Sequence, residues 1–397
     1  MIINSPWKKD FPALANTSIY YLDSAATCQV PSSVIEAVTN YLTNGHGNPG
    51  RGLHKFGENA DKVLNDCRQK VADFVGAKPD QIVFTKGATE SINFVANSMR
   101  STLTEKDSIL VTEMEHHSNL LPWQRLSQQT GARLNILPLD NNGDFDLSDL
   151  EKYLDDSCQM FAFTHGSNVL GNHPPVDKFV RQAKKAKVPT LIDGAQAVAH
   201  TPLDLDTLSC DYYVFSGHKL YAPGGSGVLY IKNDDSIEPL LLGGGIVSKT
   251  TLTDYHLTDG VAKFEAGSSN LVALVGLSAS LEYINDIGLE NIVKYEQQLY
   301  RYLLKHFQEL DDFDIVSHPD SKSVLSFHSK TIHCHDIASI LSDNKIAVRA
   351  GHHCAQPCLN AVGVKHCVRA SIGIYNDSED IDRLIDALKK VTMILAN

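Results

Sequence analysis

The chain has 397 residues, a formal net charge of −12 with neutral histidines, and 43% hydrophobic residues. This length predicts two domains, and the negative charge argues against nucleic acid as the main partner, because phosphate binding needs clustered lysines and arginines. No apolar run of about 18 residues occurs, and residues 1–10 lack a basic stretch followed by an apolar one. We therefore expect no membrane partner and a cytoplasmic location.

Short β-rich runs alternate with amphipathic helical stretches over the first part of the chain. Because strands separated by helices form βαβ units, this alternation predicts a mostly parallel sheet. The predicted strands are residues 81–85, 108–112, 133–138, 159–164, 189–192, 211–215 and 227–231, and the predicted helices are residues 87–99, 119–129 and 177–186.

From about residue 241 the pattern changes. Residues 241–260 are predicted as loop, and two long helical patterns then precede short strands mixed with helices. The sequence therefore predicts an α/β large domain over residues 16–268 and a smaller α+β C-terminal domain over residues 269–397, with residues 1–15 packed onto the latter. In the second domain the predicted helices are residues 272–285, 290–310, 335–342 and 378–395, and the predicted strands are residues 314–316, 324–328 and 346–349.

Polar side chains follow several of the predicted strands. In open α/β sheets ligands bind beyond the carboxyl ends of the strands, so we expect these side chains to share one crevice. Lys219 follows strand 211–215 and is a candidate Schiff-base nucleophile. Asp193 follows strand 189–192, and a carboxylate there would keep a pyridinium nitrogen protonated. Together they favour pyridoxal phosphate as the cofactor.

Other residues after strands are candidates for holding the rest of that cofactor. A helix start offers free N–H groups and a dipole to a phosphate, hydroxyl and imidazole groups can donate to it, and an imidazole can stack on the ring. Taken singly, such residues have commoner roles in turns, in caps or on the surface, and only their joint occurrence favours a cofactor site. The candidates are Ala88, Thr89, Ser216 and His218 for the phosphate, His117 for stacking and Gln196 for the phenolic oxygen.

Segments spread over nearly the whole chain resemble a known family. They are YLDSAAT (21–27), RGLH (51–54), KGATESIN (86–93), EMEHHSN (113–119), SNVLG (167–171), DGAQA (193–197), YVFSGHKLY (213–221), FEAGSSN (264–270), VRAGHHCAQP (348–357) and RAS (369–371). The combination of DGAQ, SGHKLY and GHHCA is highly specific. On these segments the chain resembles the class V aminotransferase family of pyridoxal-phosphate enzymes, and within it the group II cysteine desulfurases of the SufS and CsdA type.

The resemblance implies a fold type I homodimer with the active site at the subunit interface. It makes Lys219 the lysine that binds the cofactor covalently, Asp193 the partner of the ring nitrogen and His117 the stacking imidazole. The FEAGSSN loop would lend a phosphate contact to the other subunit through Ser268. Many relatives have Thr-Pro where this chain has Ser268 and Ser269, and that difference makes the loop less rigid. The remaining candidates keep the roles given above.

The resemblance also implies the reaction. Group II cysteine desulfurases remove the sulfur of L-cysteine, leave alanine and hold the sulfur as a persulfide on an enzyme thiol. They usually pass it to an acceptor protein of the SufE or CsdE type, in sulfur and iron-sulfur cluster metabolism. Cys354 is the candidate thiol, because His352, His353 and Arg349 give it the electropositive setting that favours a thiolate.

Further residues are expected around the substrate. Arg369 resembles the family arginine that binds the substrate carboxylate, a task suited to a bidentate guanidinium, although an arginine taken alone is as often part of an ordinary salt bridge. All eight cysteines are expected to be thiols. Asn168 and Arg349 would assist in substrate binding, His54 would lie near the mouth of the site, and Cys358 and Cys367 are interpreted as structural.

Three alternatives stay open. A selenocysteine lyase would use the same residues with L-selenocysteine, and a transaminase would need no thiol at position 354. A zinc-binding module belongs to another class of protein, but its candidate ligands match no familiar C-x-x-C pairing and leave Lys219 and Asp193 without a role. We therefore expect no metal at the site. The candidate zinc ligands are His352, His353, Cys354, Cys358, His366 and Cys367.

Overall fold

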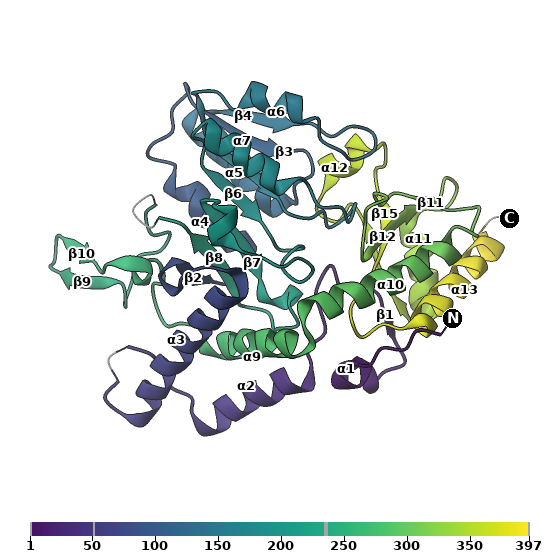
Figure 1. The fold of residues 1–397 in the computed structure, drawn as a ribbon, viewed down its shortest axis with the longest axis horizontal. Helices are drawn as coiled ribbons and strands as arrows, with labels where there is room; N and C mark the ends of the chain where they lie inside the picture. Colours follow the sequence, from purple (N-terminus) through teal and green to yellow (C-terminus); the bar gives the residue numbers. More distant parts are fainter. Residues whose placement is uncertain (1, 51, 234–236, 396–397) are drawn as a thin grey trace.

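The computed structural model describes residues 2–50, 52–233 and 237–395. Its largest sheet has seven strands, β2 (Ile82–Thr85), β3 (Ser108–Thr112), β4 (Arg133–Leu137), β5 (Cys158–Thr164), β6 (Thr190–Asp193), β7 (Tyr212–Ser216) and β8 (Gly227–Ile231), in the order β2-β8-β7-β6-β5-β3-β4 (Figure 1). The pairs from β7 through β6, β5 and β3 to β4 are parallel, whereas β8 runs antiparallel to β2 and β7. The predicted α/β fold with a mostly parallel sheet is confirmed.

Alternate residues of the strands face two separate hydrophobic cores. In β3, Ile109 and Val111 pack in one core with α4 (Ala88–Ser98) and α5 (Leu121–Thr130), while Leu110 packs in the other core with α7 (Val176–Lys185). Successive side chains of a strand point to opposite faces, and here both faces are covered. A strand in this position needs apolar residues throughout, which explains the continuous apolar runs that identified the strands.

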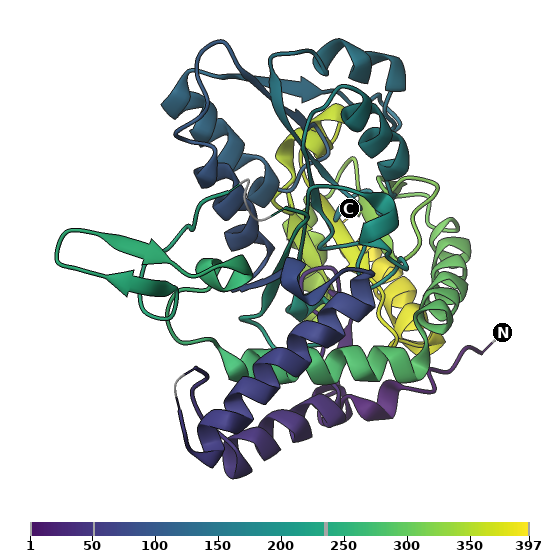
Figure 2. The same cartoon turned by 60° about the vertical axis from the view of Figure 1, so that its left-hand side comes forward.

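Two long helices that the sequence analysis did not predict pack against the large domain. These are α2 (Ser32–Asn44) and α3 (Lys55–Val75), and both contact α9 (Leu271–Ile287) (Figures 1 and 2). The buried positions of α3 include Ala60, Cys67, Val71 and Val75, a helical spacing that was readable in the sequence. The buried leucines of α9 belong to the core of the large sheet, and on this packing we propose a domain boundary nearer residue 288 than residue 269.

The small domain is built on a four-stranded antiparallel sheet of order β11-β12-β15-β14. The predicted strand 346–349 forms two short strands, and the strand at 367–371 was not predicted because the buried Arg369 interrupts its apolar pattern. The elements are α10 (Leu289–Phe307), β11 (Asp314–Ile315), β12 (Val324–His328), α11 (Cys334–Asp343), β13 (Ile346–Ala347), β14 (Arg349–Gly351), α12 (Gln356–Ala361), β15 (Cys367–Ser371) and α13 (Ser378–Leu395).

Other described helices and strands are short. They include α1 (Pro12–Ala15), β1 (Tyr20–Tyr21), α6 (Leu147–Tyr153) and α8 (Leu205–Leu208).

No described helix is by itself long and apolar enough to span a membrane. Only α9 and α10 taken together have the required length and apolar composition among the described residues, and they are bent by 75° at their junction.

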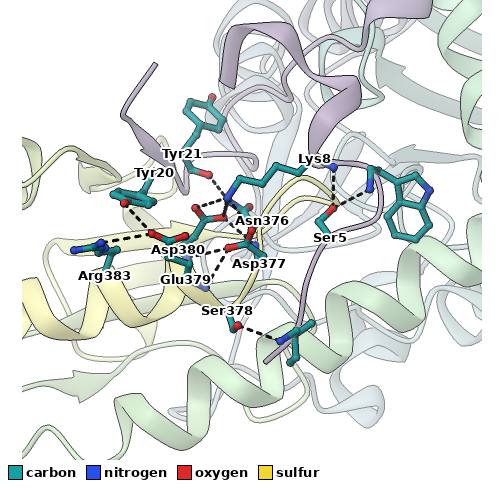
Figure 3. Close-up of polar contacts among 12 residues, drawn as sticks. Ser5, Lys8, Tyr20, Tyr21, Asn376, Asp377, Ser378, Glu379, Asp380 and Arg383 are labelled. Atoms are coloured by element: carbon teal, nitrogen blue, oxygen red, sulfur yellow. Dashed lines mark hydrogen bonds and ion pairs between the residues drawn. The ribbon is translucent and has the colours of Figure 1, made fainter. Parts of the chain in front are cut away.

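The N-terminal segment lies along the small domain (Figure 3). The backbone N–H of Ile3 donates to the Ser378 hydroxyl at 3.1 Å, and the Ser378 N–H donates to the Ile3 carbonyl at 2.9 Å. Lys8 Nζ lies 2.9 Å from Asp377 Oδ2 and 3.1 Å from Asp380 Oδ1. On these contacts we propose that residues 2–8 belong with the small domain, whereas Phe11 and Leu14 of the predicted segment pack in the core of the large sheet.

The segment predicted as loop contains an antiparallel hairpin of β9 (Val247–Thr250) and β10 (Tyr255–Leu257). The hairpin projects from the body of the protein in both views (Figures 1 and 2). Its turn is closed by the Thr251 N–H, which donates to the Asp254 carbonyl at 2.8 Å. The strands are largely exposed and carry no alternation of apolar and polar residues. The loop prediction was therefore wrong at these two strands, which pair only with each other.

Candidate active site

A cavity of about 400 Å³ lies at the carboxyl ends of β5, β6 and β7. This is the place where an open α/β sheet binds its ligands. Residues of β14 and β15 and of the segment between β14 and α12 contribute the small-domain side of the cavity. The predicted site residues that line it are Ala88, Thr89, Asn168, Asp193, Gln196, Ser216, His218, Lys219, Arg349, Cys354 and Arg369.

Asp193 and Lys219 set the electrostatics of this cavity. Asp193 ends β6, is 5% exposed, and accepts a hydrogen bond from the Ala195 N–H at 3.0 Å. Burial lowers the pKa of Lys219, and the nearby Asp193 carboxylate opposes that shift. Burial likewise raises the pKa of Asp193, against the effect of Lys219. A lysine whose neutral form is favoured is a nucleophile, and a buried carboxylate is the partner that a protonated ring nitrogen requires.

The start of α4 forms the end of the cavity that suits a phosphate. The N-cap residue of this 11-residue helix supplies no side-chain cap, so the dipole and the first-turn N–H groups after Ala88 are available to an anion. The Ser216 hydroxyl accepts from the Ala88 N–H at 2.8 Å, and Thr89 Oγ1 lies 2.7 Å from Ser118 Oγ. Burial lowers the pKa of His218 to about 4, so its imidazole is neutral and keeps one N–H to donate.

The cavity wall contains His116 rather than His117, to which the sequence analysis gave the stacking role. His116 Nδ1 accepts from the Ser118 N–H at 3.1 Å, and burial, together with nearby Lys219, lowers its pKa to about 4. The His117 ring instead lies 5.7 Å, centroid to centroid, from the His352 ring. Because adjacent side chains point in different directions, only one of two successive histidines faces the cavity, and the motif did not reveal which.

Two arginines of the small domain share one carboxylate at the cavity. Arg349 Nη2 lies 2.9 Å from Asp23 Oδ2, and Arg369 Nη2 lies 3.1 Å from Asp23 Oδ1. Arg369 also donates from Nη1 to the Asn168 carbonyl at 3.0 Å. Its Nε is buried and finds no hydrogen-bond partner in the described part of the chain, and the Arg369 side chain lines the cavity, where a guanidinium suits a carboxylate ligand. The sequence analysis did not single out Asp23, although it lies in the quoted YLDSAAT segment.

Cys354 is the one exposed thiol among the eight cysteines, all of which lie in the described residues. Cys354 and His353 have φ values of 55° and 52°, in the left-handed region that residues other than glycine seldom adopt. The Asn168 side chain donates to the His353 carbonyl at 2.8 Å, and the His117 N–H donates to the Cys354 carbonyl at 2.7 Å. Such backbone persists only where the surroundings hold it, often at functional sites, and these bonds fix the thiol-bearing loop at the cavity.

A family model for class V aminotransferases matches residues 20–384. The chain belongs to the class V aminotransferase family. Proteins named cysteine desulfurase from Yersinia pseudotuberculosis and Cronobacter sakazakii are each 39% identical to it over 397 residues, 98% of both chains. The apo structure of a cysteine desulfurase from Thermococcus onnurineus NA1 matches 100% of this chain and 99% of its own, with a TM-score of 0.94 and 36% identity. The cysteine desulfurase CsdA from Escherichia coli matches 98% of both chains, with a TM-score of 0.92 and 35% identity.

Class V aminotransferases depend on pyridoxal phosphate, and the cavity residues of this family member fit that group. The uncapped start of α4 suits the phosphate, and the buried Asp193 suits the ring nitrogen. Burial favours the neutral amine of Lys219, the form that reacts with an aldehyde. Gln196 Nε2 donates to the Ala25 carbonyl at 2.9 Å, and its second amide hydrogen is left for the phenolic oxygen.

Besides His117, two residues expected at the site lie outside this cavity. His54 caps α3, where its Nδ1 accepts from the Gly57 N–H at 3.2 Å. Nothing in the sequence distinguishes a histidine that caps a helix from one that binds a ligand. Ser268 is exposed and lines a separate hollow of about 150 Å³.

Burial raises the pKa of Cys358 and of Cys367 to about 12. Both thiols are therefore protonated at neutral pH, in line with the structural role expected for them.

Proposed function

We propose that this protein is a pyridoxal-phosphate-dependent cysteine desulfurase. It removes the sulfur of L-cysteine, releases L-alanine and holds the sulfur as a persulfide on Cys354. The observation that carries the proposal is that one cavity combines the exposed thiol of Cys354 with Lys219, Asp193 and the guanidinium of Arg369. A transaminase needs the lysine, the carboxylate and the arginine, but no thiol. The relatives named cysteine desulfurase support the same reaction.

The proposal assigns residues of the cavity to each part of the cofactor. When bound, pyridoxal phosphate supplies an electron sink that weakens bonds next to the substrate nitrogen. The chain's own residues hold and orient it, and Ser268 contributes its contact to the second subunit of a homodimer. The assignments are Lys219 to the aldehyde carbon, Asp193 to the ring nitrogen, His116 to the ring face, Gln196 to the phenolic oxygen, and Ala88, Thr89, Ser216 and His218 to the phosphate.

Arg369 recognises the carboxylate of L-cysteine. Its guanidinium lines the cavity, and its Nη groups are fixed by Asp23 and by the Asn168 carbonyl. A guanidinium held from one side in this way presents its free edge in one orientation, which lowers the entropy lost when the substrate binds. Arg349, partly exposed and paired with the same carboxylate, adds positive charge at the entrance.

Lys219 moves protons at the substrate α-carbon. Its amine is favoured in the neutral form by burial, so it can accept the α-proton and return a proton later. The neighbouring imidazole of His116 has a pKa lowered to about 4 and therefore stays neutral over the physiological range. It adds no positive charge that would oppose protonation of the amine.

Cys354 takes the sulfur. Its thiolate attacks the sulfur of the bound substrate, the S–S bond of the persulfide forms, and the Cβ–S bond breaks. The electron pair of the broken bond passes to the carbon skeleton, and two protons, one at Cβ and one at Cα, complete L-alanine. Atoms and electrons balance without an external oxidant or reductant: L-cysteine and an enzyme thiol give L-alanine and an enzyme persulfide.

Exposure of Cys354 also suits the next step, in which the outer sulfur is transferred. We include an acceptor protein of the SufE or CsdE type in the proposal, because an exposed persulfide can be reached by a second thiolate. A cytoplasmic site of action, expected from the sequence, stays a prediction.

The test is alanine formation from L-cysteine by the intact holoenzyme, with mass spectrometry of the protein after reaction. Cys354→Ala is expected to abolish turnover and the mass increase of one sulfur atom. Cys358→Ala, a buried thiol four residues further along, is the matched control and is expected to retain both. Full alanine formation by Cys354→Ala would refute the assignment of the nucleophile.

A further inference from the structure

Three metal-ligating side chains meet on the small domain, away from the residues that line the cofactor cavity. They are His333, Cys334 and His366, and their ligand atoms all lie within 4.8 Å of one another. His333 is the N-cap of α11 and Cys334 its first residue, whereas His366 directly precedes β15. Of the six zinc ligands considered from the sequence, only His366 belongs to this cluster, and the fold alone brings it to the other two.

The spacing is close to that of a tetrahedral zinc site. Zn–N bonds of about 2.05 Å and Zn–S bonds of about 2.3 Å place ligand nitrogens about 3.3 Å apart and sulfur and nitrogen about 3.6 Å apart. From separations of at most 4.8 Å, the ligands need to close by about 1.5 Å or less. Rotation of the exposed His333 and the half-buried His366 can supply this, while Cys334, 2% exposed, stays in place.

The local chemistry supports a bound cation rather than a chance contact. The rings of His333 and His366 lie 4.3 Å apart, centroid to centroid, and imidazole nitrogens are ligands that ions of the zinc class prefer. Cys334 is the first residue of a 10-residue helix. Burial raises the pKa of its thiol, and a coordinating metal ion is what deprotonates such a thiol.

Binding has one local cost. His333 Nδ1 accepts a hydrogen bond from the His335 N–H at 3.3 Å, and this bond is lost whichever ring nitrogen takes the metal, because a neutral imidazole has a single lone pair on nitrogen. The bond is long and lies at the surface, so the metal–ligand bonds outweigh it.

We propose that His333, Cys334 and His366 bind one divalent transition-metal ion of the zinc class, with water in the fourth position. One thiolate and two imidazoles select such an ion over magnesium and calcium, which take oxygen ligands. The ion joins the start of α11 to the start of β15. β15 pairs with β14 through Cys367 and Gly351, so the ion stiffens the edge of the small domain that leads to the Cys354 loop. The proposal does not depend on the proposed function.

The experiment is a Zn²⁺ titration of the intact holoenzyme against a chromophoric chelator, repeated with Co²⁺ by absorption spectroscopy. Both are run in a Cys354→Ser background, which removes the exposed thiol that would compete. We expect one equivalent of metal, tetrahedral Co²⁺ bands at wavelengths longer than those of pyridoxal phosphate, and a higher melting temperature with Zn²⁺. His366→Gln is expected to weaken Zn²⁺ binding at least tenfold, whereas His306→Gln, a histidine of α10 outside the cluster, leaves it unchanged.

Two results would overturn the proposal. One is absence of stoichiometric Zn²⁺ binding in the Cys354→Ser background. The other is a Zn²⁺ affinity that is the same with and without the His366→Gln substitution in that background. Because His366 is only half-buried, its variant keeps the fold, and the more disruptive Cys334→Ser serves as a second check through loss of the thiolate-to-cobalt charge-transfer band.

Discussion

Replacing Asp23 by asparagine tests how the two arginines are held. The change keeps the size of the side chain and one acceptor oxygen but removes the negative charge between the guanidinium groups. The Arg349 side chain is 52% exposed, so its ion pair contributes only about 0–1 kcal/mol. The Arg369 side chain is 3% exposed, and breaking a buried pair from one side costs about 3–5 kcal/mol. Because asparagine retains one acceptor, we expect the lower end, about 3 kcal/mol.

Two measurements check this expectation for Asp23→Asn. Chains longer than about 250 residues lose at most about 2 °C of melting temperature per kcal/mol, so the loss should be roughly 3–6 °C. Arg369 is also freed to move, and we expect the KM for L-cysteine to rise about tenfold or more while kcat changes less. Asp343→Asn, an exposed site on α11 with the same change of charge, is the control. An unchanged melting temperature together with an unchanged KM would show that Asp23 does not position Arg369.

Other changes test separate parts of the structure. Arg369→Lys is expected to lower kcat/KM for L-cysteine at least tenfold, about 1.4 kcal/mol, because lysine lacks the planar donor pair; steady-state kinetics equal to wild type would contradict this. A Cβ at Gly194 would lie 2.2 Å from the Tyr213 ring, so Gly194→Ala should destabilise the protein by about 1–3 kcal/mol, and an unchanged melting temperature would refute the contact. Burial lowers the pKa of His165 to about 4 and of His173 to about 3. Both stay neutral in the folded protein while the unfolded chain takes up protons below about pH 6.5, so the free energy of unfolding should fall between pH 6.5 and 4; equal urea denaturation midpoints at pH 7 and pH 5 would argue against it.

Much of the fold was predictable from the sequence because buried parallel strands have an unambiguous pattern. β3 and β8 begin and end where the apolar runs do, since both faces of these strands are covered. The prediction failed for strands that are not marked by a continuous or alternating apolar pattern. β15 contains the buried Arg369, which reads as polar but is neutralised by Asp23, and the β9–β10 hairpin carries no buried face at all.

The candidate site was predictable in residue type but less so in side-chain direction. Strand ends pointed to Asp193 and Lys219, and the GHHCA motif pointed to Cys354; the structure places all three at one cavity. Choosing between His116 and His117 needs the path of the backbone, which two identical adjacent residues do not encode. Asp23 was missed because its partners lie more than 300 residues away, and a single aspartate after a short strand gives no local sign of them.

The distance along the chain between Asp23 and its partners has a consequence during synthesis. Arg349 follows Asp23 by 326 residues, so at about 5–20 residues per second the carboxylate waits roughly 16–65 s on the ribosome for its first arginine. Through that interval β1 has no β13 to pair with, and the cavity lacks its small-domain side. A nascent chain that stops before residue 349 contains the core of the large sheet except for Ile374 and Tyr375, yet it lacks both arginines that would hold a substrate carboxylate. The protein therefore acquires its candidate active site only as its last strands leave the ribosome.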